Sequence, residues 1–82
     1  MALQEDIKRI AELREIIRED AEIIALHERI VSDAASRLEN GTITASEYIR
    51  ELGNHRRAEI NREQHRIELA KSWQNYLITS GN

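Results

Sequence analysis

Three histidines are the side chains of this 82-residue chain best suited to binding a metal ion or moving a proton. A metal site between helices needs a carboxylate three residues before a histidine, because both side chains then lie on one face. No acidic residue stands three before His27, His55 or His65. His55 and His65 are ten residues apart, which turns them roughly 80° away from each other around a helix. The spacing predicts no metal site, and we expect partly exposed histidines.

The rest of the sequence holds no arrangement typical of an enzyme or a nucleic-acid binder. It has no cysteine, no glycine-rich phosphate loop and no nucleophile paired with a base. The basic segment "HRRAEINREQHR" is interrupted by Glu59 and Glu63 and has no aromatic side chains to stack on bases. The net charge is −3, whereas nucleic-acid binders are usually basic. We expect no enzymatic activity, no cofactor and no nucleic-acid partner.

The composition favours long helices. Charged residues make up 33% of the chain, aromatic residues 4%, and proline is absent. No run of residues approaches the length of about 18 apolar residues that a membrane-spanning helix needs. We therefore expect an all-α fold.

The first half of the chain carries a heptad pattern. Alternating steps of four and three give a seam that is apolar at nine of eleven positions: Leu3, Ile7, Ile10, Arg14, Ile17, Ala21, Ile24, Glu28, Val31, Ala35 and Leu38. A second stripe lies one residue back: Leu13, Ile16, Ile23, His27, Ile30 and Ala34. Together the stripes predict a helix with more than one neighbour.

The centre of the chain reads as a turn between two helices. Asn40 and Gly41 form a helix stop, with Gly41 in the left-handed conformation that glycine adopts without a Cβ penalty. Thr44 and Glu47 have the spacing of a capping box that starts the next helix. We expect one helix over residues 3–39, a tip over 40–43 and a second helix over 44–79.

The second half is helical in pattern but more polar. Its incomplete apolar stripe consists of Ala45, Ile49, Leu52, Ile60, Ile67, Ala70, Trp73 and Leu77. We expect Trp73, Tyr76 and Leu77 to pack against the start of the first helix, around Leu3, Ile7 and Ile10.

Two long, nearly equal arms and a short turn predict a single antiparallel α-helical hairpin that resembles a coiled coil and packs into a helical bundle. Facing residue numbers then add to about 85. Opposite charges would meet in three pairs: Arg57 with Glu28, Arg62 with Glu22, and Arg66 with Glu19.

The segments "LENGTITASEYIREL" and "HRIELAKSWQNYLITSGN" resemble the C-terminal end of TolC-like outer membrane efflux proteins, in particular the Bacteroides-type members. In that family the last helical hairpin has a Gly-Thr/Val-Ile-Thr tip, and the chain closes with a Tyr-Leu segment and a glycine. The resemblance covers residues 38–82, about half of the chain, and is weaker over residues 3–37.

The resemblance implies that the hairpin is a fragment of a larger channel protein of the cell outer membrane, with this segment in the periplasm. Three protomers would form a passive tunnel for efflux or secretion. The hairpin tips would meet a periplasmic adaptor (membrane fusion) protein, and an inner-membrane pump would be an indirect partner. On its own, the fragment is expected to self-associate through its apolar face.

The resemblance also assigns roles to single residues. The adaptor-docking tip would consist of Asn40, Gly41, Thr42, Ile43 and Thr44. Glu47 and Arg50 fall where family members place two aspartates that close the pore. Glu47 keeps the acidic character and Arg50 departs from it, so an ion pair between Glu47 and Arg50 of neighbouring protomers would replace the acidic constriction.

Two other readings stay open at this point. The chain is alternatively a stand-alone soluble helical-hairpin module for protein interaction or oligomerisation. A nucleic-acid-binding arm is a third reading, which the acidic balance disfavours.

Overall fold

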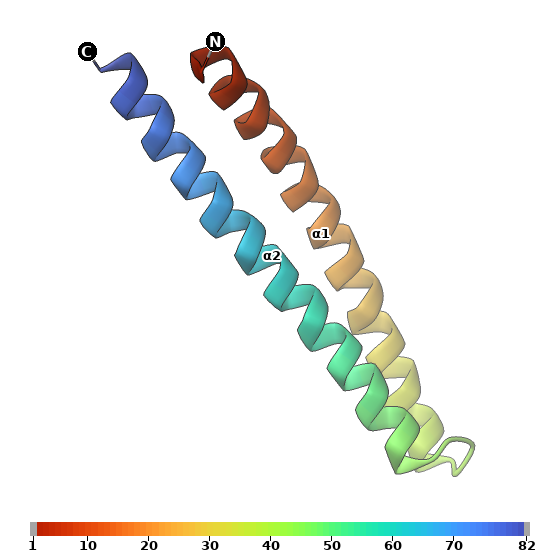
Figure 1. Ribbon diagram of the computed structural model, residues 1–82. Coiled ribbons are helices and arrows are strands. Elements are labelled where there is room, and N and C mark those ends of the chain that lie inside the picture. The colour runs from red at the N-terminus through yellow and green to blue at the C-terminus, as the bar shows by residue number, and fades with distance from the viewer. Residues whose placement is uncertain (1, 82) are drawn as a thin grey trace.

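The computed structural model describes residues 2–81, which form two long helices lying side by side (Figure 1). Helix α1 spans Ala2–Glu39 and helix α2 spans Ala45–Ser80. The helices run antiparallel, so the two ends of the chain lie together and the connecting tip lies at the far end (Figure 1). The hairpin measures 63 × 15 × 14 Å. The all-α antiparallel hairpin expected from the sequence is confirmed.

Helix α1 meets α2 along a seam that advances in steps of three and four residues. None of the seam residues is exposed: Leu3, Asp6, Ile10, Leu13, Ile17, Asp20, Ile24, His27, Val31, Ala34 and Leu38. The seam expected from the sequence is therefore partly wrong, because Ile7, Arg14 and Glu28 of that seam are exposed. In each case the residue one position earlier takes the place at the interface.

Helix α2 contributes a seam with the same steps. Its half-buried or buried members are Tyr48, Glu51, His55, Ala58, Arg62, His65, Leu69, Ser72 and Tyr76. Seven-residue periods on both helices are the geometry of an antiparallel coiled coil. Most α2 seam residues are polar, so the interface between the helices depends on polar pairs as well as on apolar packing.

The apolar stripe expected on α2 lies on the wrong side for contact with α1. All of its members are exposed: Ala45, Ile49, Leu52, Ile60, Ile67, Ala70, Trp73 and Leu77. The tip is the physical reason, because five residues join the helices and a capping box fixes where α2 begins. That start rotates Tyr48, Glu51 and His55 toward α1 and turns the isoleucines away from it.

The apolar core of the hairpin is small. Its buried hydrophobic residues are Ile10, Leu13, Ala34 and Ala58, and Leu13 alone is fully buried among the described residues. A chain that buries this little apolar surface is only modestly stable by itself. The fold therefore gains stability from any neighbour that covers its exposed faces.

Three polar pairs connect the helices along their length. Arg9 Nη2 lies 2.7 Å from Glu68 Oε2, and His65 Nδ1 lies 2.6 Å from Asp20 Oδ2. His55 Nε2 lies 3.9 Å from Glu28 Oε1. Asp20 and His65 fit the expected register, since their numbers add to 85.

The three charge pairs expected from that register do not form, because each arginine has a different environment from the one predicted. Arg57 donates to Asn54 Oδ1 and Arg66 donates to Glu63 Oε1, both within α2. Arg62 occupies a seam position, but its buried Nε has no hydrogen-bond partner. Neighbours on the same helix hold Arg57 and Arg66. The cross-helix contacts are made instead by Arg9 with Glu68 and by the two histidines of α2.

Candidate functional site: the hairpin tip

The tip is a compact turn whose backbone groups are held by local hydrogen bonds of ordinary length. Gly41 has a φ of 73°, the left-handed conformation expected for it. Its N–H donates to the carbonyl of Leu38 at 3.1 Å. Both the N–H and the hydroxyl of Thr42 donate to the carbonyl of Arg37, at 2.9 and 3.1 Å. These bonds satisfy carbonyl groups that the end of a helix leaves without a partner.

The second side of the tip is the capping box expected from the sequence. The N–H of Glu47 donates to Thr44 Oγ1 at 3.1 Å, and the N–H of Thr44 donates to Glu47 Oε2 at 3.3 Å. Thr44 has the extended backbone of an N-cap residue, with φ −87° and ψ 161°. The tip is therefore fixed at both of its ends, to α1 and to α2.

The tip presents its side chains to water at the end of the hairpin. Asn40, Gly41, Thr42 and Thr44 are exposed, while Ile43 is half-buried. The residues expected from the resemblance to form a docking tip thus lie together at the end opposite the chain termini (Figure 1). A preformed, exposed turn of this kind can bind a partner with little loss of conformational entropy.

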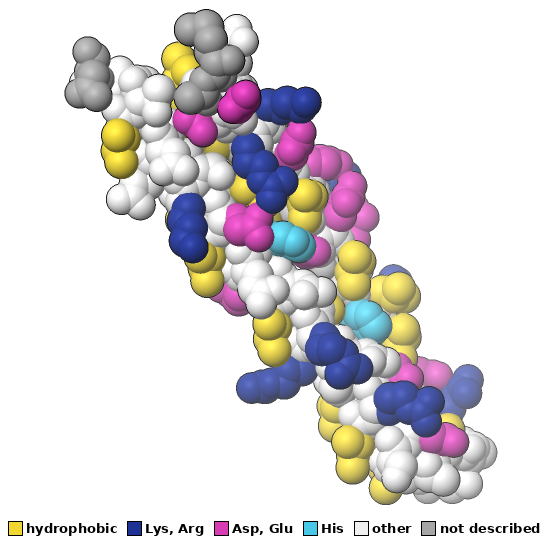
Figure 2. Space-filling view, in the orientation of Figure 1, with side chains coloured by type: hydrophobic (Ala, Val, Ile, Leu, Met, Phe, Trp, Pro, Cys, Tyr) yellow, Lys and Arg dark blue, Asp and Glu magenta, His cyan; other side chains and the backbone are white. Residues whose placement is uncertain are grey.

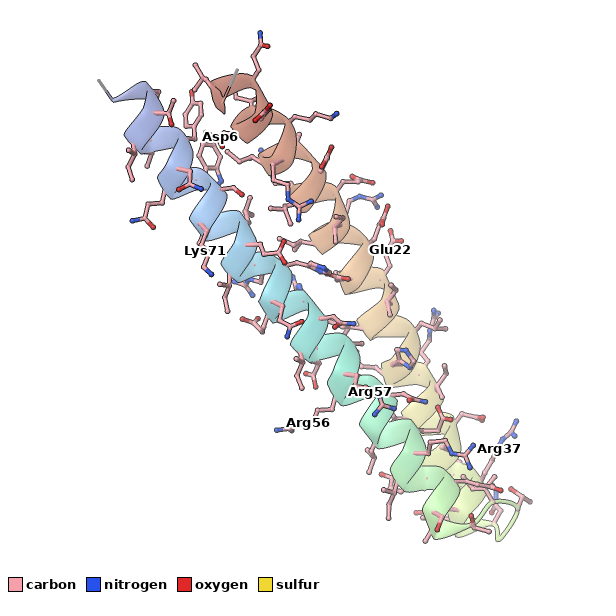
Figure 3. All side chains as sticks on the ribbon, in the orientation of Figure 1. Asp6, Glu22, Arg37, Arg56, Arg57 and Lys71 are labelled. Carbon is pink, nitrogen blue, oxygen red and sulfur yellow. The ribbon has the colours of Figure 1, made fainter. Side chains whose placement is uncertain are left out.

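A shallow groove of about 310 Å³ lies beside the tip. It is lined by residues from both helices and the tip: Ile30, Asp33, Ala34, Arg37, Ile43, Glu47, Arg50 and Glu51. Asp33 holds Arg37 through an ion pair of 3.0 Å, and the Arg37 side chain extends beside the tip (Figure 3). The groove is therefore lined by apolar side chains such as Ile30 and Ile43 and by charged ones such as Arg37 and Glu51.

Glu47 and Arg50 line the same groove but do not pair with each other. The Glu47 carboxylate is engaged by the amide of Thr44, and both residues are exposed. Arg50 has no hydrogen-bond or ion-pair partner within residues 2–81. Its guanidinium is thus available to an acidic group from outside the chain.

The three histidines lie on the seam between the helices rather than in a common site. His65 contacts Asp20, and His55 lies between Glu28 and Glu59, 3.6 Å from the latter. Among the described residues, no three His, Cys, Asp or Glu side chains are placed so that they could hold a metal ion together.

Solvent-facing charges gather on the outer side of α1. Arg18 contacts Glu15 and also lies 2.8 Å from Glu22, which Figure 3 shows on the side of α1 away from α2. The hydrogen bond from Arg18, together with the attraction of its charge, lowers the pKa of Glu15 below its ordinary value. The same contacts raise the pKa of Arg18.

Of the three residues Trp73, Tyr76 and Leu77 near the end of α2, only Tyr76 lies on the seam with α1. Trp73 and Tyr76 stack edge to face with ring centroids 5.7 Å apart. Tyr76 is half-buried on the seam, but Trp73 is 42% and Leu77 62% exposed. The expected packing patch is therefore incomplete, since two of its three members remain accessible to a further neighbour.

Sequence reasoning missed the feature that distinguishes α2, an apolar face turned away from α1. The spacing of the isoleucines could have revealed this face. Ile49 and Ile67 are 18 residues apart, as are Ile60 and Ile78, and 18 residues make a whole number of helical turns. A coiled-coil seam repeats every seven residues instead, which is not a whole number of turns of a straight helix. The seven-residue period therefore marks the face of α2 that contacts α1, and the 18-residue period marks the apolar face on the opposite side.

Comparison of the chain with protein-family models, curated proteins and solved structures finds no match. Within residues 2–81, neither helix is long and apolar enough to cross a membrane.

Proposed function

We propose that this chain is a periplasmic hairpin of a trimeric outer membrane channel for efflux or type I secretion. Its role is passive: the hairpin is part of the tunnel wall and its tip docks to a periplasmic adaptor protein. An inner-membrane pump is reached only through that adaptor. The resemblance of residues 38–82 to TolC-like proteins supports this proposal, and so does the hairpin fold.

The observation that carries the proposal is the presence of side chains for a neighbour on two opposite faces of α2. One face carries the seam with α1, including Ala58 and Tyr76. The opposite face carries exposed isoleucines, of which Ile49 is 64% and Ile67 54% exposed. A helix in the wall of a tube has a neighbour on each side, whereas a helix in an isolated hairpin has only one.

The tip is suited to docking by its rigidity and exposure. Asn40, Gly41, Thr42, Ile43 and Thr44 form the proposed contact surface for the adaptor. Hydrogen bonds from Thr42 to Arg37, and between Thr44 and Glu47, hold this surface in place before any partner binds. The groove beside the tip offers an apolar contact next to the turn.

Glu47 and Arg50 are the proposed pore constriction. Both are exposed on the first turns of α2, and Arg50 has no partner among the described residues. A contact between Arg50 of one protomer and Glu47 of the next would join opposite charges around a three-fold axis. This arrangement lacks the purely acidic ring expected of a cation-binding constriction.

The docking proposal is tested by photo-crosslinking in the source cells. A photoreactive residue is placed at Thr42, and a second variant carries it at Lys8, which is exposed near the other end of α1. We expect the Thr42 variant to crosslink to a periplasmic adaptor and the Lys8 variant not to do so. Crosslinking of Thr42 to cytoplasmic proteins alone would contradict the proposal and favour a stand-alone interaction module.

A further inference from the structure

Helix α2 carries a row of four isoleucines on the side away from α1, here called the outer isoleucine face. Ile49, Ile60, Ile67 and Ile78 are 64, 48, 54 and 61% exposed. Figure 2 shows hydrophobic side chains spaced along this edge of α2. Their angular positions agree within about 20° around the helix and lie roughly opposite Ala58 and Tyr76 of the seam.

The outer isoleucine face runs straight along the helix. Ile49 and Ile67 are separated by about five complete helical turns, and so are Ile60 and Ile78. Because whole turns separate the members of each pair, the row does not drift around α2. A partner that covers the whole row is therefore a straight helix alongside α2, without the supercoil that a seven-residue repeat imposes.

The outer side of α1 in a second copy is a poor partner for this face. It carries the charged group Glu15, Arg18 and Glu22, which is satisfied by its own ion pairs in water. Covering it with isoleucines would remove these charges from water at a cost that apolar contacts do not offset. A second copy also exposes other apolar side chains, including Ile23 (46%) and Leu26 (47%) on α1. Its own outer isoleucine face is the surface whose straight row matches the length and spacing of the first.

The spacing of the row makes this face complementary to itself. The first and last steps of the row are equal in length, so the row reads the same in either direction about a midpoint between Glu63 and Gln64. We propose that a second copy of the chain binds here, with its α2 antiparallel to the first about a two-fold axis at that midpoint. Ile49 then lies opposite Ile78 of the second copy, and Ile60 opposite Ile67.

Charges beside the row favour the antiparallel direction. Parallel copies would set Arg56, Glu63 and Lys71 each against its own counterpart, giving three contacts between like charges. Antiparallel copies place Glu63 opposite the neutral Gln64 and leave only two such contacts, both between Arg56 and Lys71. Figure 3 shows Arg56 and Lys71 extending from the side of α2 away from α1. Antiparallel helix dipoles also attract each other.

The size of the face predicts a weak dimer. The row is roughly 44 Å long and a helix contact is roughly 10 Å wide, so two copies bury about 900 Å² together. Stable complexes bury about 1,200 Å² or more. The repulsion between Arg56 and Lys71 weakens the contact further. We expect dissociation in the micromolar range, which sets the concentrations for testing.

Crosslinking determines the direction of the two helices. The sequence has no cysteine, so chains carrying Arg56→Cys or Lys71→Cys have one thiol each. The two chains are mixed at about ten times the dissociation constant and treated with a thiol crosslinker that spans about 10 Å, the distance between packed helices. We expect the mixed product to dominate, and Leu26→Cys on α1 to crosslink with neither. Preferential joining of identical chains would overturn the antiparallel arrangement.

Sedimentation equilibrium measures the contact itself. Ile67→Asp is expected to weaken dimerisation at least tenfold, while Leu26→Asp, at a similarly exposed leucine on α1, leaves it unchanged. Lys71→Glu is expected to tighten the dimer about tenfold, because each new carboxylate faces Arg56 of the other copy. A chain that stays monomeric up to about 1 mM, with helical circular dichroism, would overturn the proposal. In a three-fold channel the same face would contact a neighbouring helix of the tunnel wall, so the two-fold dimer is proposed for the isolated chain. Crosslinking of the purified chain therefore tests this inference separately from the proposed channel.

Discussion

Asp20 and His65 meet across the middle of the hairpin, with Nδ1 of His65 2.6 Å from Oδ2 of Asp20. Asp20 is 8% exposed and is the buried charged residue of the described chain. Both residues occupy seam positions, where a coiled coil usually has apolar side chains. A polar pair at such a position fixes the register of the two helices, because sliding either helix would leave a buried carboxylate without its partner.

This pair is expected to specify register rather than to add stability. Asp20→Ala leaves His65 without its acceptor and should lower the free energy of unfolding by about 1–3 kcal/mol. The double variant Asp20→Leu with His65→Leu replaces the pair by apolar contacts and should raise the free energy of unfolding by about 1–4 kcal/mol. Urea denaturation of the three chains measures both effects.

Glu28→Ala is the matched control for that series. It removes an exposed carboxylate 3.9 Å from His55 and should change the free energy of unfolding by less than about 1 kcal/mol. A double leucine variant less stable than the unmodified chain would show that the Asp20–His65 pair itself stabilises the fold.

Gly41 is expected to tolerate asparagine but not valine. A Cβ added at Gly41 would meet no atom within 4 Å, so the strain comes from its φ of 73° and not from crowding. Gly41→Val should lower stability by about 2 kcal/mol, whereas Gly41→Asn should cost less, because asparagine adopts the left-handed conformation more readily. Thermal unfolding distinguishes the two, and equal effects would argue against backbone strain.

Gly53 differs from Gly41 because it lies inside α2. A Cβ there would lie 3.9 Å from Nη1 of Arg57, an ordinary contact. Gly53→Ala should therefore raise the free energy of unfolding by about 1 kcal/mol through helix propensity. Gly41→Ala should have the opposite sign in the same urea titration. A loss of stability for Gly53→Ala would mean that this position needs the flexibility of glycine.

The capping box predicts a local effect at the start of α2. Thr44→Ala removes the acceptor for the N–H of Glu47 and should cost about 1 kcal/mol. Ser46→Ala, two residues along and also exposed, should be neutral or slightly stabilising. Hydrogen exchange should accelerate in the first turn of α2 for Thr44→Ala only, and faster exchange in both variants would point away from the cap.

The contact between Glu15 and Arg18 predicts a pH dependence of definite sign. The pKa of Glu15 is lowered from its ordinary value of 4.5, so the ionised carboxylate favours the folded state. Its stabilising contribution is present above pH 4.5 and is lost as the pH falls through the lower pKa of the folded chain. Carboxyl NMR titration should show the pKa of Glu15 rising in Arg18→Gln, with Arg14→Gln as the control that leaves it unchanged.

The hairpin, the left-handed Gly41 and the capping box were all predictable from sequence because each depends on local chemistry. Charged and aliphatic residues without proline favour long helices, and the turn residues have few alternative conformations. The choice between two heptad phases on α1 was not predictable in the same way. Ile7 and Asp6 are both compatible with a seam through Leu3 and Ile10, and the partner helix decides between them.

The sequence pattern also could not predict that the isoleucines of α2 face away from α1. An apolar stripe predicts that some neighbour exists but not which one. Here the tip rotates His55 and His65 toward α1, where Glu28 and Asp20 supply polar partners. Ile60 and Ile67 consequently face outward. The roles of Glu47 and Arg50 stay predictions, because a pore constriction forms only between protomers.

An immunoblot of fractionated source cells, with an antibody against residues 38–82, decides whether this hairpin is part of an outer membrane export channel. We expect a band several times heavier than 9.5 kDa in the outer membrane fraction. A band near 9.5 kDa in the soluble fraction would contradict it.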